Sequence, residues 1–541
     1  DLVNNLLINI ALAGKGIVGS LICIVAAIIL GRRFLQLFKV DGAPLVILIV
    51  SAVTGIIFLS ATATLITFTG LAYEIVFLAV AILAVFLCHD SIITIREEIR
   101  KISWDWLKKE PARYFILIAL FLWLYILLCS IVAPYCTDSL AYHLIIPRNI
   151  LADHTFFYNY FSYQAGLSYG WHFWGIFANI VGGARGFNCL GAWAALGLLC
   201  LIFSVVSHQY SVRHGAVAVL LSSLFLVLGI SENDRTGIDV PLILLEGAAL
   251  AVAAGTVHCN NKSRCFLVGL ICGFAMATKL TAAGGVLVIV AVLFYYLERA
   301  NRLKGIMITT AVIFVMGAFW PLLTYFYSGS PLPQLLLTMR TQGPPLPQLL
   351  ETITHDTMMY KEFFHANLAK STELKVVALS LLSGLLLLLI TENKNVFKNK
   401  LVVVLGIFAV GHWLFMGAAS SLSLFHPRYN LASILVLGIV SAIGWTEFLS
   451  RYKIVGRIVA VIILMVFVKL WTPVPLAYGV CGHFRDFLEP IGPRTSHVGS
   501  FTWISKNLPA NAIIAGPAIE TYYAQRKYIQ MQGISQEKID L

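Results

Sequence analysis

Long apolar runs recur along the chain, and they restrict its fold more than any other feature. A helix of about 20 apolar residues crosses the hydrocarbon layer of a membrane. The runs lack the short-period alternation of membrane barrel strands, so we predict helical spans. The chain is 59% hydrophobic and only 12% charged, whereas soluble proteins carry about 25% charged residues. The sequence therefore predicts an all-α polytopic membrane protein.

About 14 transmembrane helices are predicted from these runs. They cover residues 5–31, 43–68, 71–95, 114–134, 187–207, 214–231, 239–257, 265–282, 284–298, 305–325, 374–391, 400–419, 430–449 and 455–472. No pair of similar halves with broken spans stands out. Such inverted repeats are typical of transporters, so their absence from the sequence pattern disfavours that class.

Loops rich in lysine and arginine predict the orientation of the spans, because such loops stay on the cytoplasmic side. Basic clusters follow the first and third runs, at Arg32–Lys39 and Arg96–Arg113. Every later basic loop falls on the same side if the stretch Tyr169–Gly183 forms an interfacial or re-entrant helix and not a span. The segments 135–186 and 326–373 then become the two large outer loops.

The net charge of +12 follows from these short basic loops, which favour contact with anionic membrane lipids. No basic patch interleaved with exposed aromatic residues is present, so nucleic-acid binding is not expected. The ten cysteines show no metal-binding spacing. Cys136 and Cys481 are both predicted outside, which leaves a disulfide between them open.

Asp138 is the first candidate for chemistry, since it stands just past the end of an apolar run. The simpler interpretation is an aspartate that caps a helix beginning near Ser139. Tyr142, His143 and Arg148 follow closely, and a cap does not require them. We therefore expect an active site at the outer face with Asp138 at its centre.

A second acidic stretch precedes the run at 239–257 and carries Glu232, Asp234 and Asp239. Its simpler interpretation is a solvated turn, with Asp239 capping the next helix. A cap does not exclude catalysis, because acids at two outer junctions could share a cation or an acceptor hydroxyl. Glu246 lies within the same run, where a buried acid is costly and should have a partner.

Two basic groups are also predicted at outer ends of spans. Lys279 ends one run, where a lysine often extends only to the interface. His426, Arg428 and Tyr429 precede another run. Arginine offers a planar fork that suits phosphate oxygens. Its place outside runs against the usual distribution of positive charge, which favours a functional role.

These motifs, in this order, resemble the polytopic GT-C glycosyltransferases. The similarity is to the branch that holds protein O-mannosyltransferases and the aminoarabinose transferase of lipid A. It rests on Asp138 followed by Tyr142-His143-Leu144, on Asp239-Val240-Pro241-Leu242, on a proline pattern at Pro331-Leu332-Pro333, and on Arg428-Tyr429. It covers about residues 114–450. The resemblance implies a GT-C-like catalytic membrane core there and interfacial helices in the outer loop 135–186. The three spans predicted within 1–113 are additional N-terminal helices that depart from this pattern and have no assigned role.

The resemblance implies a donor made of a sugar on a polyprenyl phosphate, and a glycan, lipid or protein acceptor. Asp138 would act as the base, Asp239 would hold the acceptor or a cation, and Arg428 and Lys279 would bind the donor phosphate. Tyr142, His143, Arg148, Glu232, Asp234, His426 and Tyr429 would contact substrate. The aromatic residues Phe157, Tyr158, Tyr160, Tyr163, Tyr169 and Trp171 would stack on sugars or lie at the lipid interface. A lone acid at 138 favours a base over half of a metal site, and a divalent cation stays open.

Two alternatives remain: an oligosaccharide ligase or polymerase with a diphosphate-linked donor, and a lipid or solute transporter or flippase. After a last helix at 451–472, the segment 473–541 is predicted as a short extracytoplasmic tail with a strand at Ala512–Ala518. The orientation fits a bacterial inner membrane, with the active site facing the periplasm.

Overall fold

The computed structural model describes most of the membrane core and two short pieces of the tail. The described residues are 2–102, 104, 108, 112–131, 143–156, 168–231, 238–328, 382–388, 400–420, 431–451, 507, 509, 513–516 and 527–530. The predicted helix 455–472 lies outside them, as do most of 374–391 and of the loop 326–373. Cys136 and Cys481 also lie outside, and the eight cysteines within the described ranges are free thiols.

Helices form nearly all of the described structure. They are α1 (Leu2–Leu37), α2 (Pro44–Phe68), α3 (Glu74–Leu87), α4 (Asp90–Lys101), α5 (Ala112–Ser130), α6 (Ile145–Asp153), α7 (Gly170–Gln209), α8 (Val212–Ser231), α9 (Asp239–Ala253), α10 (Asn261–Thr278), α11 (Ala283–Tyr296), α12 (Arg302–Gly317), α13 (Phe319–Ser328), α17 (Lys400–Ser420) and α18 (Leu431–Arg451). Six stretches of the described chain are helical, long and apolar enough to cross a membrane, or seven if a bent pair counts as one span. The predicted all-α polytopic membrane fold is confirmed.

The third predicted span, 71–95, is two helices. α3 ends at Leu87, and α4 begins at Asp90 after a bend of 69°. The polar side chains that begin at His89 cannot stay in hydrocarbon without cost, which explains the break. α4 turns polar side chains toward α1: Gln36 Nε2 donates to Thr94 Oγ1 at 2.8 Å. Arg32 and Glu98 form a buried ion pair at 3.3 Å.

Two short strands pair with each other at one end of the bundle and so bring the loops after α1 and α9 together. β1 (Asp41–Gly42) follows α1 and pairs antiparallel with β2 (Val257–His258), which follows α9. Both strands lie in loops that the positive-residue count places in the cytoplasm. The start of α9 at Asp239 therefore lies at the opposite end of the bundle, together with the end of α10 at Thr278.

α7 doubles back on itself at Gly183, where φ is 67° and ψ is −166°. Residues 175 and 187 would be about 18 Å apart in a straight helix. Instead, a Cβ built on Gly175 would lie 1.9 Å from the ring of Phe187, so the two arms of α7 are in contact. Positive φ without strain requires glycine, and Gly183 therefore allows the reversal. The segment 169–183, predicted as an interfacial or re-entrant helix, corresponds to the first arm.

The first arm of α7 corrects the role expected for its aromatic residues. Trp171 is 2% exposed and Trp174 is fully buried. The indole rings lie 4.7 Å apart, nearly edge to face. Neither ring faces lipid or an open cleft, because the arm is enclosed by other helices. Trp171 thus belongs to the core and not to a sugar-stacking surface or an interfacial belt.

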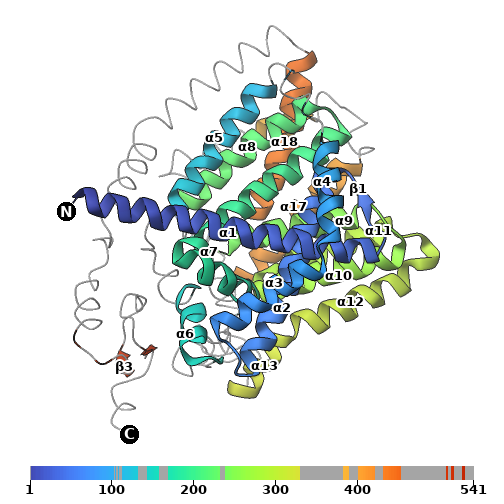
Figure 1. Cartoon of the computed structure of the whole chain (residues 1–541). Helices are drawn as coiled ribbons and strands as arrows, with labels where there is room; N and C mark the ends of the chain where they lie inside the picture. The colour runs from blue at the N-terminus through green and yellow to red at the C-terminus, as the bar shows by residue number, and fades with distance from the viewer. Residues whose placement is uncertain are drawn as a thin grey trace, which may run out of the picture.

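The N-terminal helices join the same hydrophobic core as the rest of the bundle. Figure 1 shows α1 running across α7, and α5, α8 and α18 lying side by side. Arg185 of α7 donates to the backbone carbonyl of Asn9 at 2.7 Å and to its side-chain oxygen. Trp193 Nε1 donates to Ser20 Oγ at 2.8 Å. These polar contacts link α1 to α7. The division of the chain into parts at residue 113 stays a prediction.

α1 and α2 approach most closely at Gly31 and Gly55, and we expect substitution there to destabilise the fold. A Cβ on Gly31 would lie 1.8 Å from the carbonyl oxygen of Ser51, whereas a Cβ on Gly14 of the same helix would meet nothing within 4 Å. Gly31→Ala should cost about 1–3 kcal/mol, since overpacking forces the helices apart. The midpoint of thermal unfolding in detergent measures this. Gly14→Ala is the matched control, and an equal fall in both variants would contradict the close approach.

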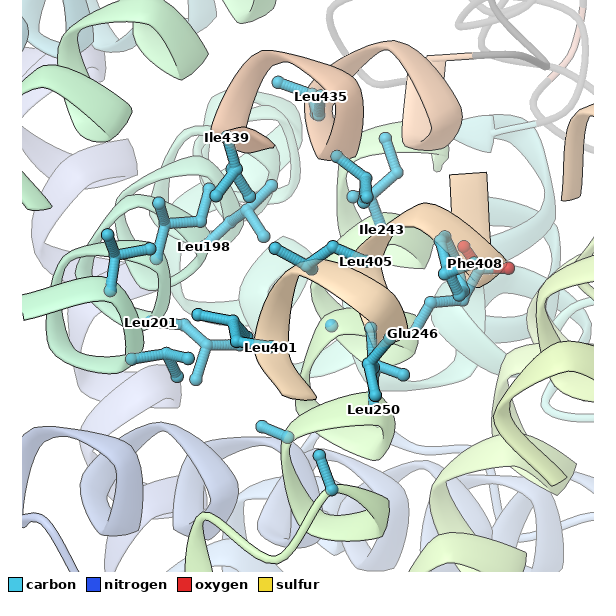
Figure 2. A pocket seen from close by; sticks show the side chains of 18 of the residues that line it. Leu198, Leu201, Ile243, Glu246, Leu250, Leu401, Leu405, Phe408, Leu435 and Ile439 are labelled. Carbon is cyan, nitrogen blue, oxygen red and sulfur yellow. The ribbon is translucent and has the colours of Figure 1, made fainter. Parts of the chain in front are cut away.

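An apolar cavity lies between α7, α9, α17 and α18 (Figure 2). Its volume is about 90 Å³. Beyond the membrane core, β3 (Ile513–Gly516) pairs in parallel with β4 (Lys527–Gln530). The strand predicted at Ala512–Ala518 is therefore present at its centre, and the placement of the tail relative to the membrane stays a prediction.

Candidate functional site

α9 and α10 are neighbours, and their adjoining ends carry an acid and a base. The Lys279 ammonium donates to Asp239 Oδ1. The lysine side chain is 16% exposed and the aspartate side chain 18%. The sequence left open a lysine that only reaches the interface and an aspartate that only caps α9. The structure instead pairs the two charges, and the N-cap position, Ile238, carries no side-chain capping bond.

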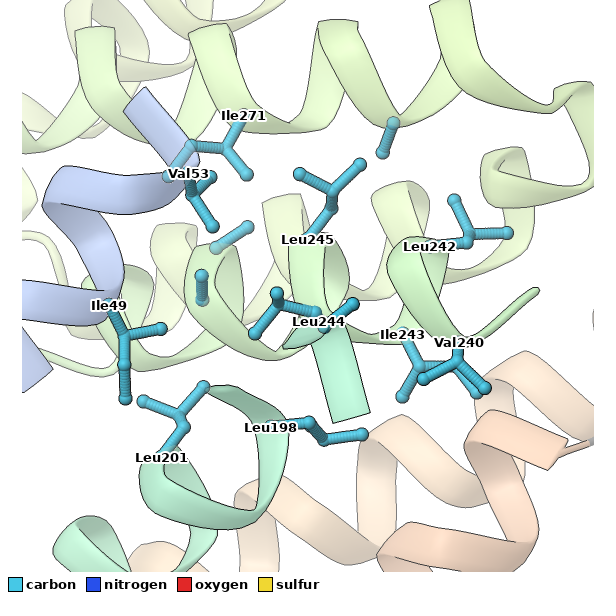
Figure 3. Close-up of a cluster of buried hydrophobic side chains, with 14 of the residues drawn as sticks. Ile49, Val53, Leu198, Leu201, Val240, Leu242, Ile243, Leu244, Leu245 and Ile271 are labelled. Atoms are coloured by element: carbon cyan, nitrogen blue, oxygen red, sulfur yellow. The ribbon is translucent and has the colours of Figure 1, made fainter. Parts of the chain in front are cut away.

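Apolar packing on all sides of α9 fixes the position of Asp239. Figure 3 shows side chains of α9 among residues of α2, α7 and α10, and all are buried: Val240, Leu242, Ile243, Leu244, Leu245, Ile49, Val53, Leu198, Leu201 and Ile271. A helix that is hydrophobic all round is held by neighbours on every face. Asp239 therefore begins a rigid element, which positions a functional group better than a loop does.

The start of α7 contacts the end of α10. A Cβ on Gly170 would lie 2.9 Å from the carbonyl oxygen of Ala277, two residues before Lys279. Ser60 of α2 donates to the carbonyl of Gly170 at 2.6 Å. Ser60 precedes the end of α2 at Phe68 by eight residues, which is about 12 Å of helix. The start of α7 therefore contacts α2 about two helical turns before the end of that helix.

A buried pair of histidines stands beside this junction. His143 Nδ1 and His172 Nε2 are 2.6 Å apart and share a hydrogen bond. The two rings are stacked, and Tyr169 meets His172 edge to face with centroids 5.4 Å apart. His143 is 2% exposed and His172 is 1% exposed. The bond connects the segment that follows Asp138 to α7, which in turn contacts α10 beside Lys279.

Aromatic rings surround the same end of α7. Tyr169 packs edge to face on Trp320 of α13, with centroids 5.2 Å apart. The ring centroid of Phe156 lies 6.0 Å from that of Trp320 and 5.2 Å from that of Phe68. Phe173 lies 5.3 Å from Trp320. The cluster joins the end of α2 and the start of α13 to α7, so Trp320 is a structural residue of this site that the sequence did not indicate.

The structure brings together only part of the predicted site. Asp239, Lys279 and His143 lie at one end of the bundle. Arg148 lies half-buried on α6, where its guanidinium donates to Asn149 Oδ1 at 3.3 Å. The remaining predicted residues lie outside the described ranges: Asp138, Tyr142, Glu232, Asp234, His426, Arg428 and Tyr429. His172, which the sequence pattern did not single out for chemistry, joins the site through His143.

The described residues contain no group of three His, Cys, Asp or Glu side chains able to hold a metal. At Asp239, a cation would also stand beside the ammonium of Lys279, and the two positive charges would repel. The arrangement suits an anion or a polar uncharged group better. Thr278 adds a buried hydroxyl without a hydrogen-bond partner among the described residues.

The fold and the site define a polytopic membrane protein with an ion pair and a histidine pair at one end of its helices. Neither a family model nor a curated protein sequence matches the chain. Among solved structures, it is similar to ArnT from Cupriavidus metallidurans in the apo state. The identity is 16%, the match covers 77% of this chain and 84% of that chain, and the TM-score is 0.48.

The chain is also similar to the archaeal oligosaccharyltransferase AglB from Archaeoglobus fulgidus, solved in complex with an inhibitory peptide and a dolichol-phosphate. The identity is 12%, with a TM-score of 0.46, and the match covers 80% of this chain and 65% of that chain. The chain thus spans slightly less than two thirds of the archaeal protein. At these values, neither similarity assigns an activity to the chain.

Proposed function

We propose that the chain is a membrane glycosyltransferase of the GT-C type, which transfers a sugar from a polyprenyl-phosphate donor to an acceptor at the extracytoplasmic face. The observation that carries the proposal is the Lys279–Asp239 pair, placed beside the histidine pair at one end of the bundle. The order of the motifs around Asp138, Asp239 and Arg428 supports the same class. A transporter would instead gather its polar groups near the membrane midplane.

In the proposed reaction, Asp138 accepts the proton of the acceptor hydroxyl as its oxygen attacks the anomeric carbon of the sugar. The bond between that carbon and the phosphate oxygen breaks, and the polyprenyl phosphate leaves. One displacement inverts the anomeric centre. The main electrostatic task is to stabilise the negative charge that develops on the leaving phosphate.

In the proposed reaction, Lys279 and Arg428 stabilise the negative charge on the leaving phosphate. Lys279 is less than one-fifth exposed, and its charge acts more strongly there than it would in bulk water. Asp239 neutralises this ammonium and holds it in place. When the donor phosphate binds, Asp239 is available to accept a hydrogen bond from an acceptor hydroxyl. Thr278 offers a further buried hydroxyl next to the ammonium.

The proposed orientation places this site outside. The paired strands β1 and β2 lie at the end of the bundle where basic residues such as Arg33 and Lys262 gather in the sequence. Since positive loops stay in the cytoplasm, the end with Asp239 and Lys279 faces the other compartment. In a bacterium this compartment is the periplasm, and the protein would reside in the inner membrane.

Transfer of radiolabelled sugar tests the proposal. Purified protein in liposomes should move label from a polyprenyl-phosphate sugar to an added glycan, lipid or peptide acceptor and should release polyprenyl phosphate. A matched polyprenyl-diphosphate donor should give far less product. Transfer from the diphosphate alone would support the ligase alternative, whereas label that crosses the bilayer without changing its carrier would support a flippase.

A further inference from the structure

His143 is the residue at which the segment that carries Asp138 joins the described bundle. It is 2% exposed, and α6 begins two residues later at Ile145. Ile145, Pro147 and Ile150 of α6 are buried as well. Asp138 precedes His143 by five residues, and five residues of chain extend at most about 18 Å. The position of His143 therefore limits where the carboxylate of Asp138 can lie.

His172 holds His143 by a directional contact. Its Nε2 lies 2.6 Å from Nδ1 of His143, and the two rings stack with centroids 4.8 Å apart. Such a bond needs one nitrogen that carries a proton and one that accepts it. Both imidazoles are buried away from water, which makes the bond costly to break. A satisfied polar pair in an apolar setting therefore fixes one arrangement of the two segments.

The arm of α7 that carries His172 also contacts the helix end that precedes Lys279. A Cβ on Gly170 would lie 2.9 Å from the carbonyl oxygen of Ala277, two residues before the lysine. Most side chains of this arm are buried. One enclosed element thus contacts the segment that follows the proposed base and the helix end that precedes the proposed phosphate-binding group. Reacting groups gain rate when they are held in such a fixed geometry.

Given the proposed function, we propose that His172 is a positioning residue for sugar transfer. Through His143 it fixes the chain that follows Asp138, so that the carboxylate meets the acceptor hydroxyl. His172 is 1% exposed and touches neither the substrate nor the reacting atoms. Its effect on the rate is therefore expected to act through the base.

Three replacements of His172 separate the bond from the ring. Glutamine can place an amide where Nε2 stands, asparagine places its amide nearer the backbone, and phenylalanine keeps the ring without a polar atom. Because the bond uses Nε2, His172→Phe and His172→Asn should lower kcat by about 10–100-fold, whereas His172→Gln should lose no more than about fivefold. The KM for the donor should stay within about twofold of wild type, since the phosphate-binding groups remain.

Two further measurements identify the base as the group through which His172 acts. The loss in His172→Phe should shrink with acceptors of more acidic hydroxyl, since these need less help from a base. Added to Asp138→Asn, His172→Phe should slow transfer by less than about twofold more, because residues that act as a unit are not additive. All rates come from radiolabel transfer and are expressed per folded protein, with melting midpoints measured for each variant.

His214 supplies the matched control. It is 8% exposed, and its Nε2 bonds to Glu447 Oε1 at 2.9 Å. It lies in the first turn of α8, a helix of 20 residues whose other end leads toward α9. His214→Phe also removes a buried imidazole bond and should lower the melting midpoint, but its rate should stay within about twofold of wild type for every acceptor.

The outcomes separate the role of His172 from the proposed function. A His172→Phe rate equal to wild type, equal losses in all three replacements, or a loss that does not depend on acceptor acidity would overturn the positioning role and leave the proposed function in place. Absence of transfer by the wild-type protein would overturn both.

Discussion

Replacing Lys279 by methionine is expected to reduce sugar transfer by about 10²–10³-fold, the usual effect of removing one preorganised charge at a developing oxyanion. Methionine keeps most of the length and apolar stem of lysine and removes the ammonium. The loss should appear mainly in kcat, because the negative charge on the phosphate grows as the sugar leaves. Initial rates of radiolabel transfer over a range of donor concentrations separate kcat from KM.

Lys262 supplies the matched control for this prediction. It lies exposed in the first turn of α10, while Lys279 follows the last turn of the same helix. Lys262→Met should retain the wild-type rate within about twofold, since an exposed basic residue contributes little beyond orientation. If Lys279→Met retains half or more of the wild-type rate, the ammonium does not act on the leaving phosphate.

A double-mutant cycle with Asp239 tests whether the ion pair works as one unit. Residues in contact show interaction energies of about 0.5–3 kcal/mol. We therefore expect Asp239→Asn combined with Lys279→Met to transfer sugar no more slowly than the worse single variant. Full additivity of the two losses would indicate separate roles. The melting midpoints of all three variants must be compared, because Lys279→Met also leaves a partly buried carboxylate without its partner.

The positions of the helices were accessible from the sequence because membrane length and hydropathy determine them. The predicted start at residue 239 coincides with the start of α9. The common end of Asp239 and Lys279 followed from counting spans. The sequence did not predict their contact, because a lysine at the end of a span can extend to the membrane interface as well as to a neighbouring helix. Helix rotation decides that choice, and packing on every face of α9 sets the rotation.

α7 shows where sequence reasoning was insufficient. Its aromatic residues are typical of an interfacial belt as well as of a buried core. Hydropathy does not distinguish these environments, because both favour Trp and Tyr. Gly183 permits the reversal, but the chain holds 41 glycines, and a positive φ at one of them leaves no signal in a single sequence. The bond from His143 to His172 depends on this reversal and was equally hidden.

The sequence predicts a partner for the carboxyl group of Glu246, and the described structure shows none. The cost of a buried acid predicts a partner within the bundle.

Replacing Asp138 by asparagine is expected to reduce transfer by about 10²–10⁴-fold, the range typical of a lost general base. Asparagine keeps the size of the side chain and its hydrogen-bonding capacity but cannot accept the proton of the acceptor hydroxyl. Transfer to an acceptor with a more acidic hydroxyl, which needs less help from a base, should be affected less. Comparing acceptors of graded hydroxyl acidity in the radiolabel assay therefore tests the role and not only the importance of the residue.

Asp153 offers a control for Asp138→Asn on the same predicted outer segment. It is the last residue of α6 and is half-buried. Asp153→Asn removes a carboxylate of the same kind and should leave the rate within about twofold, as most substitutions outside a site do. Because Asp138 precedes His143 by only five residues in the chain, a change in activity must be separated from a disturbance of the histidine pair. The unfolding midpoint of Asp138→Asn should match wild type, and a rate equal to wild type would remove Asp138 from the mechanism.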